Sequence, residues 1–196
     1  MTRDDLIAFT DDLAAEYNAA KIPHPVHLSD GNEDQLIAAF RDIAPDDWAL
    51  GGWRFHYQSL LKGVPADELR AAIRRGESMS LAFPEHRILC SAIVGGILPI
   101  ALGVALAIKR VGGPERVHCW LGDMTAEGGM AHECMAYARN HRLPIRWIIE
   151  DNSVSVCTDT RAAWGGVTDW SALPDVLFYR YKSRYPHAGS GKRIEF

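Results

Sequence analysis

Residues 116–152 restrict the possible fold more than any other part of the sequence. Two apolar segments, "RVHCWL" (116–121) and "IRWIIE" (145–150), have the length and composition of buried strands, and a segment with helical spacing lies between them at about 128–140. Alternating strands and helices favour parallel pairing. The sequence therefore predicts an α/β fold with a parallel sheet and helices on both faces.

Polar residues follow both of these strands. Gly122 and Asp123 come after the first strand, Asp151 and Asn152 come after the second, and 26 residues separate Met124 from Asp151. Ligands of α/β sheets bind at the carboxyl ends of the strands, so Asp123 and Asn152 would lie side by side there if the strands are neighbours. Mg²⁺ prefers such oxygen ligands, whereas an Asp after a strand on its own is often only a helix N-cap. The pair together predicts a site for Mg²⁺ and phosphate.

The remaining segments extend this architecture without a visible repeat or linker. Helical spacing or strand composition is found in four further segments, which are helices at 4–22, 29–45 and 65–76 and a last strand at 175–182. We expect a single domain over 1–196, with an N-terminal helical part to about residue 45 and a C-terminal tail from about residue 183.

One segment imitates a membrane span. Residues 88–108 carry no charge over 21 positions, which is long enough to cross a bilayer. The segment is rich in Gly and Ala and is interrupted by Pro99, which suits the first turn of a helix. We expect a turn followed by a buried helix over 99–110 and no membrane insertion. A helix that is apolar on all sides must be covered all round, which indicates a partner subunit.

The overall composition excludes some classes of function. A net charge of −4 and a pI near 6.0 provide no general basic field, so nucleic-acid binding is not expected. The four cysteines are scattered without a CxxC pair, and "MTRDDLIAF" does not have the pattern of a secretory leader. We therefore expect reduced thiols and a cytoplasmic location. His24 and His27 of "HPVH" have no third ligand nearby and are not expected to bind a metal.

The segment "GDMTAEGGMAHECMAYARNHRLPIRWIIEDN" (122–152) resembles the thiamine diphosphate signature, in which Gly-Asp-Gly is followed after such an interval by Asn-Asn. It is similar, in particular, to the diphosphate-binding domain in the alpha subunit of 2-oxo acid dehydrogenase first components. "WRFHYQSLLKGVPADELRAAI", "AIVGGILPIALGVALA" and "FYRYK" are similar to further segments of that family. The resemblance covers about residues 24–164 and the last strand, and it implies a thiamine diphosphate-binding α/β fold.

The resemblance implies roles for individual residues. The side chains of Asp123 and Asn152 and the Val154 carbonyl would bind Mg²⁺. Arg54 would hold the diphosphate. The complete set implied for thiamine diphosphate binding is Trp53, Arg54, Ala92, Val94, Gly122, Asp123, Met124, Thr125 and Asn152. His56 matches a family histidine near the active site and, with His187 of the tail, is a candidate catalytic residue.

The sequence departs from the family pattern in three places. Met124 replaces the second Gly of the signature, which would cause strain if that position needs a positive φ. Asp151 replaces the first Asn. The tail "KSRYPHAGSGKRIEF" stands in place of the family's His-Gly-His-Ser loop, and four of its side chains could contact a substrate phosphate or carboxylate, namely those of Lys182, Arg184, His187 and Lys192.

These observations lead to three hypotheses of function. The first is the alpha subunit of an enzyme that decarboxylates a 2-oxo acid and transfers the acyl or aldehyde unit, with a pyrimidine-binding beta subunit that supplies the catalytic Glu in an α2β2 assembly. The second is half of a split transketolase-like enzyme that moves a two-carbon unit between sugars, which the basic tail would support by holding a sugar phosphate. The third is a scaffold or regulatory subunit without cofactor, suggested by Met124 and the missing loop.

Overall fold

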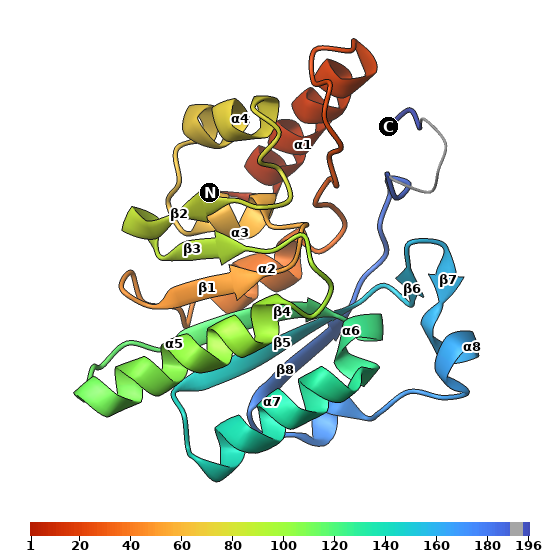
Figure 1. The fold of residues 1–196 in the computed structure, drawn as a ribbon. Helices are drawn as coiled ribbons and strands as arrows, with labels where there is room; N and C mark the ends of the chain where they lie inside the picture. The colour runs from red at the N-terminus through yellow and green to blue at the C-terminus, as the bar shows by residue number, and fades with distance from the viewer. Residues whose placement is uncertain (189–193) are drawn as a thin grey trace.

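The computed structural model describes residues 1–188 and 194–196 (Figure 1). Its centre is a six-stranded sheet of order β2-β3-β1-β4-β5-β8, in which β2 alone runs antiparallel to its neighbour. The strands are β1 Trp48–Gly51, β2 Ala82–Phe83, β3 Ile88–Cys90, β4 Val117–Gly122, β5 Ile145–Asp151 and β8 Val176–Arg180. A separate small hairpin consists of β6 Val154–Ser155 and β7 Thr158–Asp159.

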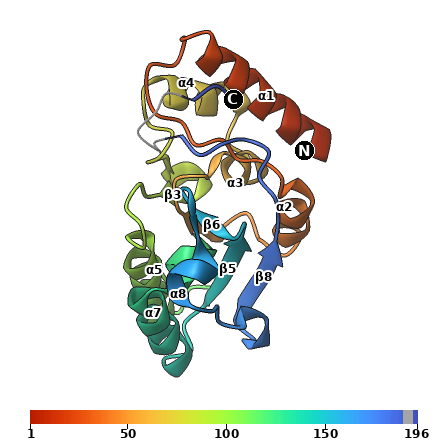
Figure 2. The ribbon, with the colours of Figure 1, turned by 90° about the vertical axis from the view of Figure 1, so that its right-hand side faces the viewer.

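Helices cover both faces of the sheet. Figure 2 shows α5 and α7 on one side of β5 and β8 and α2 on the other. The helices are α1 Arg3–Asn18, α2 Glu33–Phe40, α3 His56–Leu61, α4 Ala66–Arg74, α5 Ile97–Val111, α6 Asp123–Glu127, α7 Gly129–Asn140 and α8 Thr160–Trp164, with short 3-10 turns at Pro84–His86 and Trp170–Ala172. The predicted α/β fold with a parallel sheet and helices on both faces is confirmed.

The sheet divides the core into two halves, as its strands β4 and β5 show. Successive side chains of a strand point to opposite faces. In β4, Cys119 and Leu121 therefore pack with α5 and α7, while Trp120 between them packs with the N-terminal helices. In β5, Trp147 and Ile148 divide in the same way. Both strands are apolar on both faces because both faces are covered.

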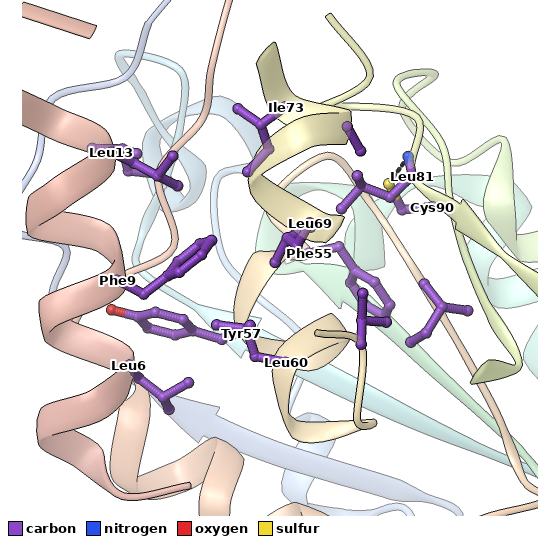
Figure 3. Close-up of a cluster of buried hydrophobic side chains, with 14 of the residues drawn as sticks. Leu6, Phe9, Leu13, Phe55, Tyr57, Leu60, Leu69, Ile73, Leu81 and Cys90 are labelled. Carbon is purple, nitrogen blue, oxygen red and sulfur yellow. Dashed lines mark hydrogen bonds between the residues drawn. The ribbon is translucent and has the colours of Figure 1, made fainter. Parts of the chain in front are cut away.

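The N-terminal helices form the larger half of the core. Thr2 and Asp5 make a capping box that begins α1. Figure 3 shows α1 side chains facing those of α3 and α4 across this cluster, and the labelled members on these helices are Leu6, Phe9, Leu13, Tyr57, Leu60, Leu69 and Ile73. The N-terminal helical part therefore packs in the same cluster as residues of β1, β3, β4 and β5.

The first two helices are shorter than predicted. Helix α1 ends at Asn18 because Ala20 adopts a left-handed φ of 57°. Helix α2 begins at Glu33 because Gly31, with a φ of 79°, turns the chain just before it. Strands β1 and β3 and helices α3, α6 and α8 were not predicted, and β3 lies where a turn was expected. These elements have only three to six residues, too few to show a hydrophobic period.

Helix α5 begins two residues before Pro99, which therefore lies in its first turn. It ends at Val111, and the next residue, Gly112, caps it with a left-handed φ of 68°. Within this chain α5 buries one face, formed by Ile97, Leu98, Ala101, Ala105 and Ile108, while Ile100 on the other side is 44% exposed. The expected complete cover is thus not provided by the chain itself. Across the part of the chain that the structure describes, every helix is too short or too polar to span a bilayer.

Candidate functional site

The main pocket lies at the carboxyl ends of the parallel strands. It measures about 760 Å³, including space open to solvent, and its walls come from the residues that follow β1, β4, β5 and β8 and from the start of α5. Its lining residues are Gly52, Trp53, Arg54, Phe55, Ile93, Val94, Gly95, Ile97, Trp120, Leu121, Gly122, Asp123, Met124, Thr125, Glu150, Asn152, Val154, Ser155, Val156 and Tyr181. Figure 1 shows α6 and the β6–β7 hairpin at this end of the sheet.

Asp123 and Asn152 reach the pocket from neighbouring strands. Strands β4 and β5 pair in parallel, with Gly122 opposite Glu150, so the residues that follow both strands meet at one edge. The Asp123 side chain is buried, and its Oδ2 accepts a hydrogen bond of 2.5 Å from the Thr160 hydroxyl. Burial, with a smaller contribution from the charge of Asp151, raises the pKa of Asp123 to about 6 in spite of the Thr160 bond, which acts in the opposite direction.

The loop after β5 presents further oxygen atoms. The Asn152 Oδ1 accepts a hydrogen bond from the Val154 N–H at 3.3 Å, and Ser153 and Val156 adopt left-handed φ values of 65° and 58°. No cluster of three His, Cys, Asp or Glu side chains suited to a metal occurs within residues 1–188 and 194–196. A metal at this edge would therefore take oxygens from one carboxylate, one amide, one carbonyl and its ligand, a set that suits Mg²⁺.

Met124 is not strained. It lies in α6 and has no positive φ, so the backbone at this position does not require glycine. Its Sδ accepts a hydrogen bond of 3.0 Å from the Trp164 Nε1–H. The replacement of the signature's glycine thus leaves the backbone relaxed and adds a side-chain contact.

Arg54 lines the same pocket as Glu150 but forms no salt bridge within the described residues. No acidic oxygen lies within 4.0 Å of its guanidinium in the described residues. Its NH2 lies 3.0 Å from His187 Nδ1. Because a guanidinium can only donate, Nδ1 accepts and His187 carries its proton on Nε2. The His187 ring stacks on that of His27, with 4.5 Å between the ring centroids, and faces Trp53 edge-on, with 6.5 Å between the centroids.

Several predicted residues lie elsewhere. His56, a predicted catalytic residue, is completely buried, with Nε2 2.9 Å from the Ser78 hydroxyl, and does not line the pocket. It begins α3, which turns its side chain into the interior. Ala92 is exposed beside the pocket without lining it, and Arg184 pairs with Asp11 and Asp30. Lys182 does not line the pocket, and the predicted Lys192 lies outside the described residues.

Among the pocket residues that were not predicted, two have ionisable side chains, Glu150 and Tyr181. Glu150 Oε1 accepts hydrogen bonds from Asn32 Nδ2 at 2.7 Å and from the Tyr179 hydroxyl. Burial raises the pKa of Glu150 to about 7, although these bonds and the charge of Arg54 act in the opposite direction. A signal for Glu150 was present, because it is a charged residue at the carboxyl end of an apolar strand, where ligands of α/β sheets bind.

The buried His56 leads to a prediction about stability. Burial lowers the pKa of His56 from 6.5 to about 4, so between these values the unfolded chain binds a proton that the folded chain does not. Its contribution to stability is complete above pH 6.5 and is lost as the pH falls towards 4, by up to about 1.4 kcal/mol per pH unit. We expect the difference in unfolding free energy between the wild type and His56→Gln to shrink at that rate, measured by urea unfolding.

Only the difference between the two proteins is informative, because other groups titrate in the same range. The pKa of His27 is lowered in the same way, whereas the raised pKa values of Asp123 and Glu150 act with the opposite sign. These contributions are common to both proteins and cancel in the comparison. A difference that stays constant from pH 7 to pH 4 would show that His56 titrates normally in the folded protein.

Comparison with known proteins places the chain in a class. A family profile described as "Dehydrogenase E1 component" matches residues 1–168. The chain therefore belongs to the dehydrogenase E1 component family, and the resemblance predicted from the signature is confirmed.

The individual relatives are alpha subunits. The chain is 27% identical over 165 residues to the pyruvate dehydrogenase E1 component subunit alpha of Porphyra purpurea, covering 76% of this chain and 48% of that protein. It is 29% identical over 163 residues to the chloroplastic subunit alpha-3 of Oryza sativa subsp. japonica, covering 74% and 38%. The chain spans less than half the length of these relatives. A solved structure from Mycobacterium smegmatis, assigned in its description to the thiamin diphosphate-dependent enzymes, aligns with 66% of this chain and 23% of its own, with 15% identity and a TM-score of 0.45.

Proposed function

We propose that this chain is the alpha subunit of a two-subunit enzyme that uses thiamine diphosphate and Mg²⁺ to decarboxylate a 2-oxo acid and transfer the resulting acyl or aldehyde unit. One observation supports this most strongly: a single pocket combines the oxygen ligands Asp123 and Asn152 with the cation Arg54, which has no carboxylate partner within 4.0 Å in the described parts of the chain. Such a site is complementary to a diphosphate with its metal ion.

Each residue would have a defined role. Asp123, Asn152 and the Val154 carbonyl would hold Mg²⁺, and Arg54 would donate to the diphosphate. His187 accepts from Arg54 and so orients its guanidinium. When bound, thiamine diphosphate supplies the electron sink that breaking a carbon–carbon bond beside a carbonyl requires. The chain's own contribution is to bind and orient the cofactor.

The proposal includes a second subunit. Members of this family that the chain resembles are named alpha subunits, and the exposed apolar residues Ile93, Val94 and Ile100 lie at the mouth of the pocket and on α5. A beta subunit covering this region would supply the glutamate that activates the aminopyrimidine, in an α2β2 assembly. The chain alone would then bind cofactor weakly and catalyse nothing.

The two other hypotheses lose part of their support. The transketolase-like alternative relied on a free basic tail, but Arg184 is paired with Asp11 and Asp30. The scaffold alternative relied partly on strain at Met124, and Met124 is unstrained. The site formed by Asp123, Asn152 and Arg54 would serve a transketolase-like enzyme equally, so the activity assay distinguishes the two enzymes.

The test is reconstitution of activity. The chain is co-purified with its partner subunit and supplied with Mg²⁺, thiamine diphosphate and an artificial electron acceptor, and release of CO₂ from a panel of 2-oxo acids is measured. We expect turnover by the complex and none by either subunit alone. Two-carbon transfer between sugar phosphates without decarboxylation would favour the transketolase-like enzyme, and full activity of the isolated chain would contradict the need for a partner.

A further inference from the structure

We propose that Thr160 is a positioning residue for Asp123, and that α8 is held against the site by the contact between Trp164 and Met124. The inference rests on the proposed function, in which Asp123 is a ligand of Mg²⁺. It assigns a role to the segment after the β6–β7 hairpin, which the signature does not include.

The Thr160 hydroxyl is buried and donates a hydrogen bond to Asp123. The residue is 2% exposed, its N–H donates to the Ser153 carbonyl at 3.1 Å, and its hydroxyl donates to Asp123 Oδ2 at 2.5 Å. Asp159, directly before it, caps α8 by accepting from the Ala162 N–H at 2.7 Å. A hydroxyl fixed in this way uses one oxygen of the carboxylate and leaves Oδ1 for another ligand.

Asp123 needs such a restraint because it lies between two hollows. Besides the main pocket, it lines a second hollow, whose walls also include Thr160, the cations Arg161 and Arg180, and the carboxylates Glu127 and Asp151. Arg180 already pairs with Asp151 at 3.0 Å on that side. The Thr160 bond fixes Oδ2 on the side of the second hollow. Without that bond the carboxylate would be free to rotate among the charges there, so the hydroxyl holds the carboxylate in one orientation and leaves Oδ1 for a metal ion.

The segment that carries Thr160 is attached to both ends of α6, the helix that begins with Asp123. At one end, Trp164 Nε1–H donates to Met124 Sδ at 3.0 Å. At the other end, Glu127 accepts from the Thr168 N–H at 2.9 Å, from the Thr168 hydroxyl at 2.8 Å and from Trp170 Nε1–H at 2.9 Å. The glycine that the signature has in place of Met124 would offer Trp164 no acceptor. The methionine thus helps to hold α8 against α6.

The experiment compares Thr160→Val, which keeps the shape and removes the hydroxyl, with Thr160→Ser, which keeps the hydroxyl. Binding of thiamine diphosphate to the complex with the partner subunit is followed by calorimetry while the Mg²⁺ concentration is varied. A hydrogen bond to a charged group corresponds to a loss of about 10- to 100-fold when removed. We expect the Mg²⁺ concentration for half-saturation to rise at least tenfold in Thr160→Val and less than twofold in Thr160→Ser.

The outcomes separate this inference from the proposed function. If the wild type shows no Mg²⁺-dependent binding, the proposed function fails and the inference fails with it. If the wild type binds and Thr160→Val binds equally well, the inference alone is overturned. Should Thr160→Val fold poorly, as judged by circular dichroism, Trp164→Phe is measured instead, since Trp164 is half exposed and its replacement leaves Thr160 in place. A rise in the Mg²⁺ concentration that this variant needs for half-saturation supports the proposal that the Trp164–Met124 contact holds α8 against the site. An unchanged concentration overturns that proposal.

Discussion

Asp123→Ala is expected to abolish Mg²⁺-dependent binding of thiamine diphosphate while the protein stays folded. Asp123 is the only carboxylate among the three oxygen ligands proposed for the metal. Replacing groups that merely support a metal ligand weakens metal binding by about 10- to 100-fold, so loss of the ligand itself should cost more than 100-fold. Calorimetry on the complex measures this loss directly.

The fold should tolerate this substitution well. Burial raises the pKa of Asp123 from 3.8 to about 6, which means that the ionised carboxylate costs the folded protein free energy at neutral pH. Its removal relieves that cost, and we expect the melting temperature of the metal-free variant to equal or exceed that of the wild type. Asp46→Ala, which removes an exposed aspartate, is the matched control and should bind normally. Normal binding by Asp123→Ala would remove Asp123 from the metal site.

Arg54→Gln is expected to weaken binding of thiamine diphosphate by about 10- to 100-fold at saturating Mg²⁺, the range for loss of charge-assisted hydrogen bonds. The guanidinium lines the pocket and bonds to His187, and the shorter neutral amide replaces neither the charge nor the reach. Arg54→Lys keeps the charge but not the planar pair of donors, so its affinity for thiamine diphosphate should lie between those of the wild type and Arg54→Gln.

The control for this substitution is Arg110→Gln, which removes an exposed arginine at the end of α5. Affinity for thiamine itself, which lacks the diphosphate, should be affected much less by Arg54→Gln than affinity for thiamine diphosphate. Equal loss for both ligands would show that Arg54 acts through the shape of the pocket and does not contact the diphosphate.

The sheet edge was predictable from the sequence because its determinants are local. Strands β4 and β5 are long apolar runs, and a polar residue follows each run at the point where parallel strands end. That pattern predicts that Asp123 and Asn152 lie together, and both line the same pocket in the structure. The interval between the two motifs then identified the family.

The parts that were missed depend on contacts distant in sequence. His56 stands two residues after Arg54, but α3 begins at His56 and its side chain turns towards Ser78. The position of His187 beside Arg54 depends on Asp30, whose buried carboxylate accepts hydrogen bonds from the chain near residues 183–185. No local spacing encodes such a contact. The contact of Thr160 with Asp123 likewise depends on the packing of α8 against α6, which the local sequence does not reveal.

Binding of thiamine diphosphate through Mg²⁺ at the edge formed by β4 and β5 is tested by a calorimetric titration of the complex with the cofactor, made once with Mg²⁺ and once with a chelator. We expect saturable binding of one cofactor per chain with Mg²⁺ and none with the chelator. Absence of binding in both conditions, or equal binding in both, would show that this edge does not hold the cofactor through a metal ion.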